Sequence, residues 1–551
     1  METEMEMVSA ESIGIGEDLT PPLSPISYSL HDAFLHSHCS SCFSPLPSSS
    51  SPNPNPNHHH GHGGLLYCSS SCCESSHSPL HHFSSSAHLL SPSLEPSDLR
   101  VALLFLLQIK PHFNSSYHRI CGLMSNRHRL LTSTNDDDDL AIRIRNGARA
   151  MAAAAATDGE FLLEEAEAVL CAVLTNAVEV QDRMGRSVGI AVYDTCFSWI
   201  NHSCSPNASY TFLPPETPRG GQRCCLITPS SSQPFDDTPS HLLTGLAGGP
   251  KIVVRSIKTI KKGEQVTVSY TDLLQPKELR QSELWSKYRF TCCCHRCAAH
   301  PLTYVDQHLQ DSCRSDDFVT EYIDDAIDDY LCSNDTESCC KKLEDALLNH
   351  KTRLHPQNHL SLKAYTTLAS AYSSASAIAM EDEDGLKMKR FSAAYSLLLA
   401  LQTHDLFLHE SSLIASVSNF WIGAGESLIN LATRLVSSRK WGGCGCGCRS
   451  IDIREANLEV LKEYVLKCIS DIIGGGKVWK FLVGGNGYLE VVPMDMRWVE
   501  SKTVGDDECV DGQQVFGLGA HCLLYGGILA NISGGHDSPL SCYVGRLLDE
   551  L

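Results

Sequence analysis

The chain is short of positive charge. Its 551 residues include 43 lysines and arginines against 64 aspartates and glutamates, which gives a net charge of −21 at pH 7. Proteins that bind nucleic acid without regard to its sequence neutralise phosphates with Lys and Arg, so this charge balance disfavours direct nucleic-acid binding. An acidic surface suits a basic partner such as a lysine-rich tail, and it also serves plain solubility.

Long apolar segments are scarce as well. The longest apolar run, residues 101–109, contains Gln108 and is far shorter than the roughly 20 residues that cross a bilayer. The N-terminal stretch METEMEMVSAE is acidic and lacks the apolar core of a secretory signal. We therefore expect no membrane association and a reducing, intracellular compartment, nucleus or cytoplasm. There the 26 cysteines are thiols or metal ligands rather than disulfides.

Strand and helix signals are mixed before residue 300. Alternating and β-branched residues predict strands at residues 187–193, 251–257 and 265–270. Apolar residues at helical spacing mark residues 97–131, and residues 140–176 are rich in the helix formers Ala, Glu and Leu.

Two stretches have the composition of surface loops. Residues 43–64 (FSPLPSSSSPNPNPNHHHGHGG) are rich in Ser, Pro, Asn and His, and residues 214–250 are rich in Pro, Gly, Ser and Thr. Such compositions do not support a packed core, so we predict surface insertions. The neighbouring histidines and the cysteines at 444, 446 and 448 lack a clear ligand pattern, and we interpret them as loop residues.

The part of the chain after residue 300 is helical in character. Residues 359–372 (HLSLKAYTTLASAY) look like the first helix of a tetratricopeptide-type pair, without a period clean enough to count repeats. Residues 476–551 are Gly-rich with apolar patches and give no clear prediction. Periodic apolar residues predict helices at residues 337–350, 358–379, 386–404 and 411–437.

One group of cysteines has metal-ligand spacing. Cys292, Cys294 and Cys297 form a C-x-C-x2-C motif, which places three thiolates within one tight turn and suits tetrahedral zinc. The obvious fourth ligand is Cys204, if the fold brings it near. Cys293 lies between the ligands and points elsewhere in this interpretation. The alternative is a chance cluster of reduced thiols.

A second group lies near the N-terminus. Cys39 and Cys42 are spaced C-x2-C, and Cys68 and Cys72 are spaced C-x3-C, so the two pairs can make a complete four-thiolate zinc site. The loop between the pairs costs little, because loop-closure entropy grows slowly with length. The alternative is unpaired cysteines in a Ser-rich loop.

Four specific motifs occur in the first 300 residues. They are SVGIAVY at residues 187–193, NHSCSPNA at 201–208, KKGEQVTVSYTD at 261–272 and YRFTCCCHRC at 288–297. Together they resemble the SMYD family, which are SET-domain methyltransferases with a MYND zinc finger inserted in the SET fold. The resemblance covers most of the chain in order, beginning with Gly14-Ile15-Gly16 where the family has a Gly-x-Gly strand.

The resemblance implies an α+β fold: a SET-domain β-fold of short sheets with a zinc-finger insert and a post-SET zinc site, followed by an α-helical, tetratricopeptide-like C-terminal domain. A family MYND finger has eight ligands in four pairs, and this chain matches only the first and third. The implied domains are the N-terminal part of the SET domain (1–30), a degenerate MYND-like zinc-binding insert (31–85), a helical SET insert (86–186), the SET catalytic core (187–290), the post-SET zinc motif (291–300) and the helical C-terminal domain (301–551).

The resemblance also implies an activity, namely protein-lysine N-methylation with S-adenosyl-L-methionine as methyl donor and zinc as structural metal. Tyr270 would be the catalytic residue and Tyr288 would line the lysine channel, although either ring alone could simply pack in a core. The residues implied in cofactor binding are Gly14, Gly16, Asn176, Asn201, His202, Tyr270 and Phe290. The substrate would be a histone tail or another Lys-rich protein, with partner proteins possible on the helical C-terminal domain. The alternative is a catalytically weak SET-like scaffold that binds partners through that domain.

Overall fold

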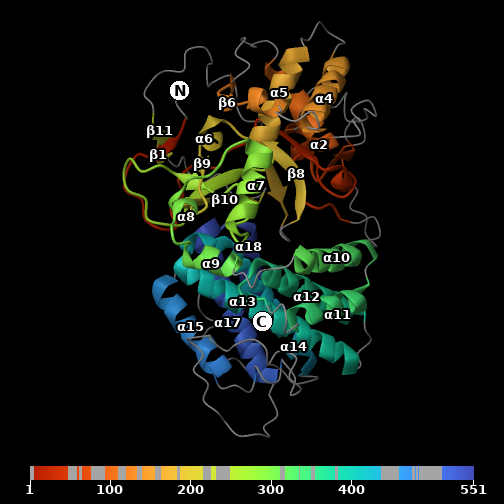
Figure 1. The fold of residues 1–551 in the computed structure, drawn as a ribbon, viewed down its shortest axis with the longest axis vertical. Helices are drawn as coiled ribbons and strands as arrows, with labels where there is room; N and C mark the ends of the chain where they lie inside the picture. Colours follow the sequence, from red (N-terminus) through yellow and green to blue (C-terminus); the bar gives the residue numbers. More distant parts are fainter. Residues whose placement is uncertain are drawn as a thin grey trace. The chain divides into compact units, whose positions relative to one another are not determined.

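The structure is a computed structural model, shown in Figure 1. The cysteines at 444–448 and most of the His-rich stretch, which we predicted to be loop residues, lie outside the described part of the chain. The described residues are 5–47, 59–60, 65–75, 94–109, 119–132, 139–155, 163–182, 186–214, 225–230, 248–310, 317–333, 335–348, 354–378, 383–435, 458–474, 478, 482 and 512–551.

The chain forms two compact units, and each is described by itself. The first unit consists of Met1–Thr271, Gln281–Cys292 and Asp537–Pro539. The second consists of Asp272–Arg280, Cys293–His536 and Leu540–Leu551.

Small β-sheets dominate one part of the first unit. β8 is the middle strand of a three-stranded antiparallel sheet of order β2-β8-β7. β8 and β12 confirm the predicted strands at 187–193 and 251–257. The prediction at 265–270 was too long, because the Tyr270 N–H bonds to a side chain and not to a neighbouring strand. The strands are β1 (Met7–Ser9), β2 (Ser27–Leu30), β7 (Val178–Gln181), β8 (Ser187–Val192), β9 (Asn201–His202), β10 (Ala208–Phe212), β11 (Ile227–Pro229), β12 (Ile252–Ser256) and β13 (Thr267–Val268).

Main-chain pairing reaches into both predicted loops. β11, within residues 214–250, pairs antiparallel with β1, and Ile13 bridges to Ile260. β3 (His59–His60), within residues 43–64, pairs with β4 (Leu66–Tyr67). The loop predictions were wrong at these short strands, because composition does not reveal which backbone groups pair with a distant strand.

Helices form the other part of the first unit. α2 (Pro96–Ile109), α4 (Asp139–Ala155) and α5 (Leu163–Asn176) pack into one apolar core that also receives Ile190 and Val192 of β8. α4 and α5 confirm the helical prediction for 140–176 wherever that stretch is described.

Among the described residues of 97–131, the helical prediction was right at the two ends, in α2 and in α3 (Arg127–Leu131). Between them β5 (Arg119–Ile120) and β6 (Leu123–Met124) form a hairpin. Its turn residues Cys121 and Gly122 have φ values of 51° and 83°, which a right-handed helix cannot contain.

The second unit is helical among its described residues. The four helices predicted between residues 337 and 437 are all present, whereas the tetratricopeptide-like character of residues 359–372 stays a prediction. Its longer helices are α10 (Asp317–Ser333), α11 (Thr336–Leu348), α12 (His359–Ile378), α13 (Glu383–His409), α14 (Ile414–Leu435), α15 (Leu458–Gly474), α17 (Gly512–Gly534) and α18 (Pro539–Glu550).

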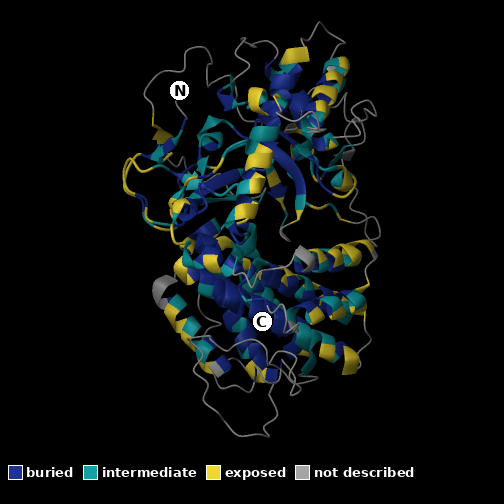
Figure 2. Cartoon of the chain, in the orientation of Figure 1, coloured by how far each residue is buried: buried dark blue, intermediate teal, exposed yellow. Residues whose placement is uncertain are grey.

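The Gly-rich tail supplies a core helix of this unit. α17 packs along α14, and a Cβ added at Gly526 would lie 2.6 Å from Cγ1 of Ile422, so only glycine allows this approach. α17 is long and apolar enough to cross a membrane, but 89% of its most apolar window is buried inside the protein, as expected for a core helix. Figure 2 shows α17 in the dark blue of buried residues.

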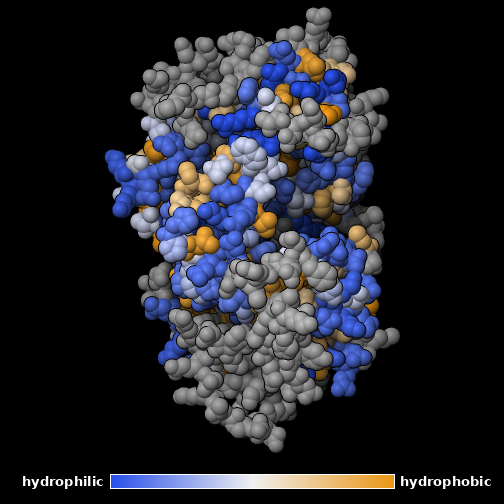
Figure 3. Space-filling view, viewed as in Figure 1, coloured by the Kyte–Doolittle hydropathy of each residue, from blue (hydrophilic) through white to orange (hydrophobic). Residues whose placement is uncertain are grey.

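The described surface is mostly hydrophilic on the face shown in Figure 3, where apolar residues form separate small patches. A few large apolar side chains are exposed singly, among them Trp285 at 55% and Leu331 at 73%. Single exposed apolar residues are normal for folded proteins and mark no site by themselves.

Candidate active site

β9 and β13 bring two distant motifs together. The two strands pair in parallel, with His202 opposite Val268, and the Ser203 N–H donates to the Val268 carbonyl over 3.0 Å. The start of the motif at residues 201–208 therefore lies beside β13, and Tyr270 follows two residues after that strand, so the two motifs meet as the sequence predicted for a shared site.

His202 links the predicted catalytic tyrosine to a predicted metal ligand. Its Nδ1 accepts the backbone N–H of Tyr270 over 3.0 Å, which places the proton of a neutral imidazole on Nε2. Nε2 lies 3.2 Å from Sγ of Cys204. Because both ring nitrogens have a partner, the orientation of the imidazole is fixed, and His202 connects the backbone of Tyr270 to the thiol cluster.

Asn207 connects the motif at residues 201–208 to the stretch around β13 by hydrogen bonds. Its carboxamide is buried, donates from Nδ2 to the Gln265 carbonyl and accepts the Thr267 N–H at Oδ1, both over 2.9 Å. Both partners belong to the stretch that contains β13. This role could not be predicted from the sequence, because an Asn after a Pro is typical of an ordinary turn.

Four rings form one cluster around Tyr270. Its ring centroid lies 4.9 Å from that of Tyr288 and 5.4 Å from that of His202, and Phe290 lies 6.0 Å from His202. Tyr288 is the last residue of α7 (Lys277–Tyr288), and Arg289 ends that helix with a left-handed φ of 58°. The structure thus brings together Tyr270, Tyr288, Phe290 and His202.

The Tyr270 hydroxyl is a hydrogen-bond donor in this setting. It donates to the Ile200 carbonyl over 2.5 Å. Burial, followed by the nearby phenols of Tyr288 and Tyr210, raises the pKa of Tyr270 above its ordinary value of 10.0. The phenol therefore keeps its proton at neutral pH and can orient a substrate, whereas it cannot act as a general base there.

The two asparagines predicted for the cofactor have backbone partners. Asn201, on β9, donates from its carboxamide to the Met5 carbonyl over 3.3 Å. Asn176 is the last residue of α5 and donates to the carbonyls of Met124 and Ala172 over 2.8 and 2.7 Å. Their cofactor roles stay predictions.

Gly14 and Gly16 form a turn held against β12. The Ser256 hydroxyl donates to the Gly14 carbonyl over 2.6 Å, and the Gly16 N–H donates to the Ser256 carbonyl over 2.9 Å. Gly16 has a φ of 79°, which glycine adopts without strain. The two glycines are therefore part of a turn rather than of the predicted strand, and their cofactor role is untested.

The four cysteines of the post-SET prediction converge. The Sγ atoms of Cys204, Cys292, Cys294 and Cys297 all lie within 4.8 Å of one another. In a tetrahedral site with Zn–S distances of about 2.3 Å, sulfurs stand about 3.8 Å apart, so the four thiols fit zinc. The backbone of Cys292 is clamped by the Gln281 side chain through hydrogen bonds of 2.8 and 2.9 Å.

The N-terminal cysteines also converge. The Sγ atoms of Cys39, Cys42, Cys68 and Cys72 lie within 4.8 Å of one another, and Cys68 is 3.6 Å from both Cys42 and Cys72. Cys72 lies on the short helix α1 (Ser70–Ser75), whereas Cys39 is buried beyond η1 (Asp32–Phe34). This cluster also fits a tetrahedral zinc ion, as its spacing predicted.

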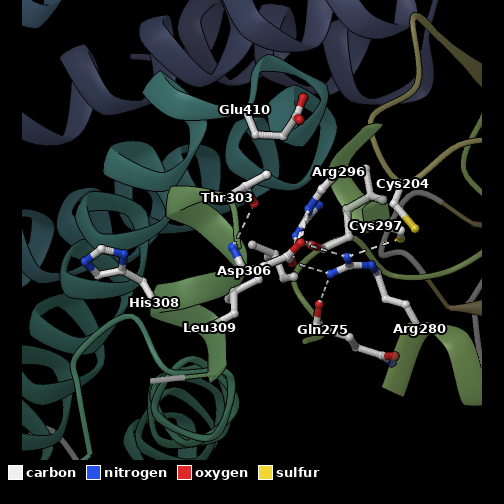
Figure 4. A network of polar contacts seen from close by, with 12 residues as sticks. Cys204, Gln275, Arg280, Arg296, Cys297, Thr303, Asp306, His308, Leu309 and Glu410 are labelled. Atoms are coloured by element: carbon white, nitrogen blue, oxygen red, sulfur yellow. Dashed lines mark hydrogen bonds and ion pairs between the residues drawn. The ribbon is translucent and has the colours of Figure 1, made fainter. Parts of the chain in front are cut away.

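A buried ionic network that the sequence did not reveal lies behind Cys297. Asp306 of α9 (Tyr304–Gln310) accepts 2.7 Å bonds from Arg280 and from Arg296 of α8 (His295–Ala298), and all three side chains are completely buried (Figure 4). Nη2 of Arg280 also lies 3.9 Å from Sγ of Cys297. Although burial acts to raise the pKa of Asp306, the bonds from both arginines hold it below its ordinary value.

The network would compensate negative charge beside the thiols if they hold zinc. Four thiolates around one Zn²⁺ carry a net charge of −2, and buried charge is tolerated only when it is compensated. The guanidiniums of Arg280 and Arg296, which share one carboxylate, would offset part of that charge. No signal in the sequence distinguishes Arg280 from the exposed charged residues around it in KELRQSELWSKY.

Comparison with known proteins agrees with this geometry. The SET domain family matches residues 158–271, which include β9, β13 and Tyr270. Histone-lysine N-methyltransferase SMYD3 of Mus musculus is 24% identical over 236 residues, 42% of this chain and 46% of that protein. Protein SET DOMAIN GROUP 41 of Arabidopsis thaliana is 38% identical over 580 residues, 97% of this chain and 99% of that protein. This chain belongs to the family of SMYD-type SET-domain proteins.

A further relative shares the SET region. SET domain and MYND-type zinc finger protein 6 of Schizosaccharomyces pombe is 30% identical over 129 residues, 23% of this chain and 19% of that protein. Tyr288, Phe290 and the cysteines from Cys292 onward lie after the residues that the family profile matches. In this SET-domain protein their roles stay predictions, and the contacts described above are what supports them.

Proposed function

We propose that this SET-domain protein transfers a methyl group from S-adenosyl-L-methionine to a lysine side chain of a histone or another Lys-rich protein. The observation that carries the proposal is the protonated hydroxyl of the half-buried Tyr270 in the four-ring cluster, two residues after the strand that pairs with β9. Relatives named as lysine methyltransferases, SMYD3 and N-lysine methyltransferase SMYD2-B of Danio rerio, support the reaction type.

The chemistry needs a neutral amine and good alignment. Free lysine has a pKa of about 10.4, and an apolar channel lowers it because burial disfavours the charged form. The cofactor supplies a methyl group on a positively charged sulfur. Tyr288 and Tyr270 are the walls that exclude water from the amine, and their ring faces attract a cation. The Tyr270 hydroxyl orients the amine for in-line attack.

The remaining residues position the cofactor in this proposal. Phe290 packs on the adenine ring, and Asn201 and His202 offer the carboxamide and backbone groups of β9. Gly14 and Gly16 allow close backbone approach, and Asn176 contacts the polar end of the cofactor. The acidic balance of the chain favours a basic substrate segment.

Cofactor binding tests the proposal most directly. We expect calorimetry to detect S-adenosyl-L-methionine binding to folded, zinc-loaded protein, and we expect methyl transfer to at least one member of a panel of Lys-rich proteins. Absence of cofactor binding by such protein would leave the alternative, a scaffold that binds partners through the helical C-terminal unit.

The thiol clusters give a prediction of metal content. We expect two zinc ions per chain, and we expect Cys204→Ser and Cys39→Ser each to remove one of them, because each replaces a ligand of a different cluster. Elemental analysis of the purified variants measures this. Cys293→Ser is the matched control, since Cys293 is exposed and lies between two ligands without joining the cluster. An unchanged zinc content in Cys204→Ser would remove Cys204 from the ligand set.

A further inference from the structure

Two cysteines outside both zinc clusters form a pair of their own. The Sγ atoms of Cys196 and Cys225 lie 3.7 Å apart. Among the described residues, only the two tetrathiol clusters gather three or more potential metal ligands, and neither includes this pair. Two thiols without further ligands are suited to redox chemistry rather than to holding a metal.

Cys196 lies on the segment that leads into the active site. It is the second residue of α6 (Thr195–Ser198), and its N–H donates to the carboxylate of Asp194 over 3.1 Å. The same segment continues to Ile200, whose carbonyl accepts the Tyr270 hydroxyl. Cys196 is therefore four residues from the carbonyl that accepts the Tyr270 hydroxyl, so a movement of α6 would reach that contact.

Cys225 is accessible and activated. It is exposed, lies just before β11, and its Sγ is 3.4 Å from the Ile227 carbonyl. The hydrogen bond from Cys196 lowers the pKa of Cys225 to about 6. A thiol whose pKa is lowered and which has a second thiol in contact has the two properties of a redox-sensitive pair.

We propose that Cys196 and Cys225 form a reversible disulfide when the protein meets a peroxide. This bond would displace α6 and thereby disturb the hydrogen bond between the Tyr270 hydroxyl and the Ile200 carbonyl, which reduces methyl transfer. The regulatory half of this inference rests on the proposed function, whereas formation of the bond does not.

The reaction takes place in two steps. The Cys225 thiolate attacks one oxygen of hydrogen peroxide, which breaks the O–O bond, releases hydroxide and leaves a sulfenic acid on Cys225. Sγ of Cys196 then attacks the sulfenic sulfur, and the S–S bond forms as water leaves. In total, two thiols and one peroxide give one disulfide and two waters, with two electrons passing from sulfur to oxygen. A thiol reductant reverses the bond by exchange.

The geometry explains why a Cys196–Cys225 disulfide would affect the active site. The two sulfurs must close from 3.7 Å to the disulfide length of about 2.05 Å. Phe197, next to Cys196, is buried in the apolar core, so α6 cannot follow the sulfur without disturbing packing. A misplacement of about 1 Å can cost up to a hundredfold in rate, and we expect a loss of roughly tenfold here.

Peptide mass mapping of the full-length, zinc-loaded chain tests bond formation. After peroxide at an amount that releases no zinc, we expect a peptide linked through Cys196 and Cys225 that disappears on addition of dithiothreitol. Cys224 precedes Cys225 in the sequence, so Cys224→Ser is the matched control: it should keep the linked peptide, and Cys225→Ser should lose it. Absence of the linked peptide, or its persistence in Cys225→Ser, overturns the inference.

Methyl transfer before and after oxidation tests the regulatory half. We expect a roughly tenfold loss that dithiothreitol restores, and full resistance to peroxide in Cys225→Ser. Equal loss in that variant assigns the effect to other thiols, and a linked peptide with unchanged turnover removes the regulation. A reduced protein that binds no cofactor and transfers no methyl group contradicts the proposed function instead, while the mapping result stands on its own.

Discussion

Methyl transfer by a Tyr270→Phe variant is expected to fall by roughly a hundredfold or more, the size of effect seen when one positioned hydrogen-bond donor is removed from an active site. The ring stays in the cluster with Tyr288 and His202, so binding of S-adenosyl-L-methionine should be retained. Turnover under saturating cofactor and calorimetric affinity measure the two quantities separately. The fall should appear in kcat more than in cofactor affinity.

Tyr193→Phe is a suitable control for this substitution. Tyr193 is fully buried and, like Tyr270, donates to a carbonyl over 2.5 Å, that of Pro250, but it lies outside the four-ring cluster. Loss of the Tyr193 hydroxyl should lower the free energy of unfolding by about 1 kcal/mol and leave turnover nearly unchanged. Equal turnover in Tyr270→Phe and the wild-type protein would take the catalytic role away from Tyr270.

The largest expected effect on stability is at Asp306. Asp306→Asn removes the carboxylate that two completely buried guanidiniums share and is expected to lower the free energy of unfolding by about 3–5 kcal/mol. The cost arises because Arg280 and Arg296 stay buried with their charges less well compensated. Chemical denaturation of zinc-loaded protein measures it.

Asp329→Asn provides the comparison for an exposed pair. Asp329 accepts a 2.7 Å bond from Lys342, and its side chain is 67% exposed. Solvent screens such a pair, so the loss should be at most about 1 kcal/mol. Similar losses of unfolding free energy in the two variants would show that the buried Asp306 network stabilises the protein no more than an exposed ion pair. A loss confined to Asp306→Asn would support its structural role.

The sequence predicted the parts of the site that depend on residue type and spacing. Cysteines at ligand spacing converge in both clusters, and the motif around His202 lies beside Tyr270. These predictions succeed because cysteines at this short spacing match the ligand spacing of zinc sites, and because alternating β-branched residues specify strands.

What the sequence could not supply depends on contacts between distant residues. Arg280 and Asp306 look like ordinary surface charges until the fold buries them together. The Cys196–Cys225 contact joins residues that no spacing rule connects. In α17, glycines that usually weaken a helix allow it to pack closely on α14, which explains why local propensity supplied no clear prediction for the tail.

The pairing of Ile13 with Ile260 has a consequence for synthesis of the chain on the ribosome. Residues near the N-terminus emerge first, yet their partners in β11 and around Ile260 are translated more than 200 residues later. At about 5–20 residues per second the early segment waits roughly 12–50 seconds before it can pair. During that interval Met7 and Ile13, both buried in the finished fold, are without their native partners. Chaperone dependence during translation is therefore expected to be concentrated in this N-terminal segment.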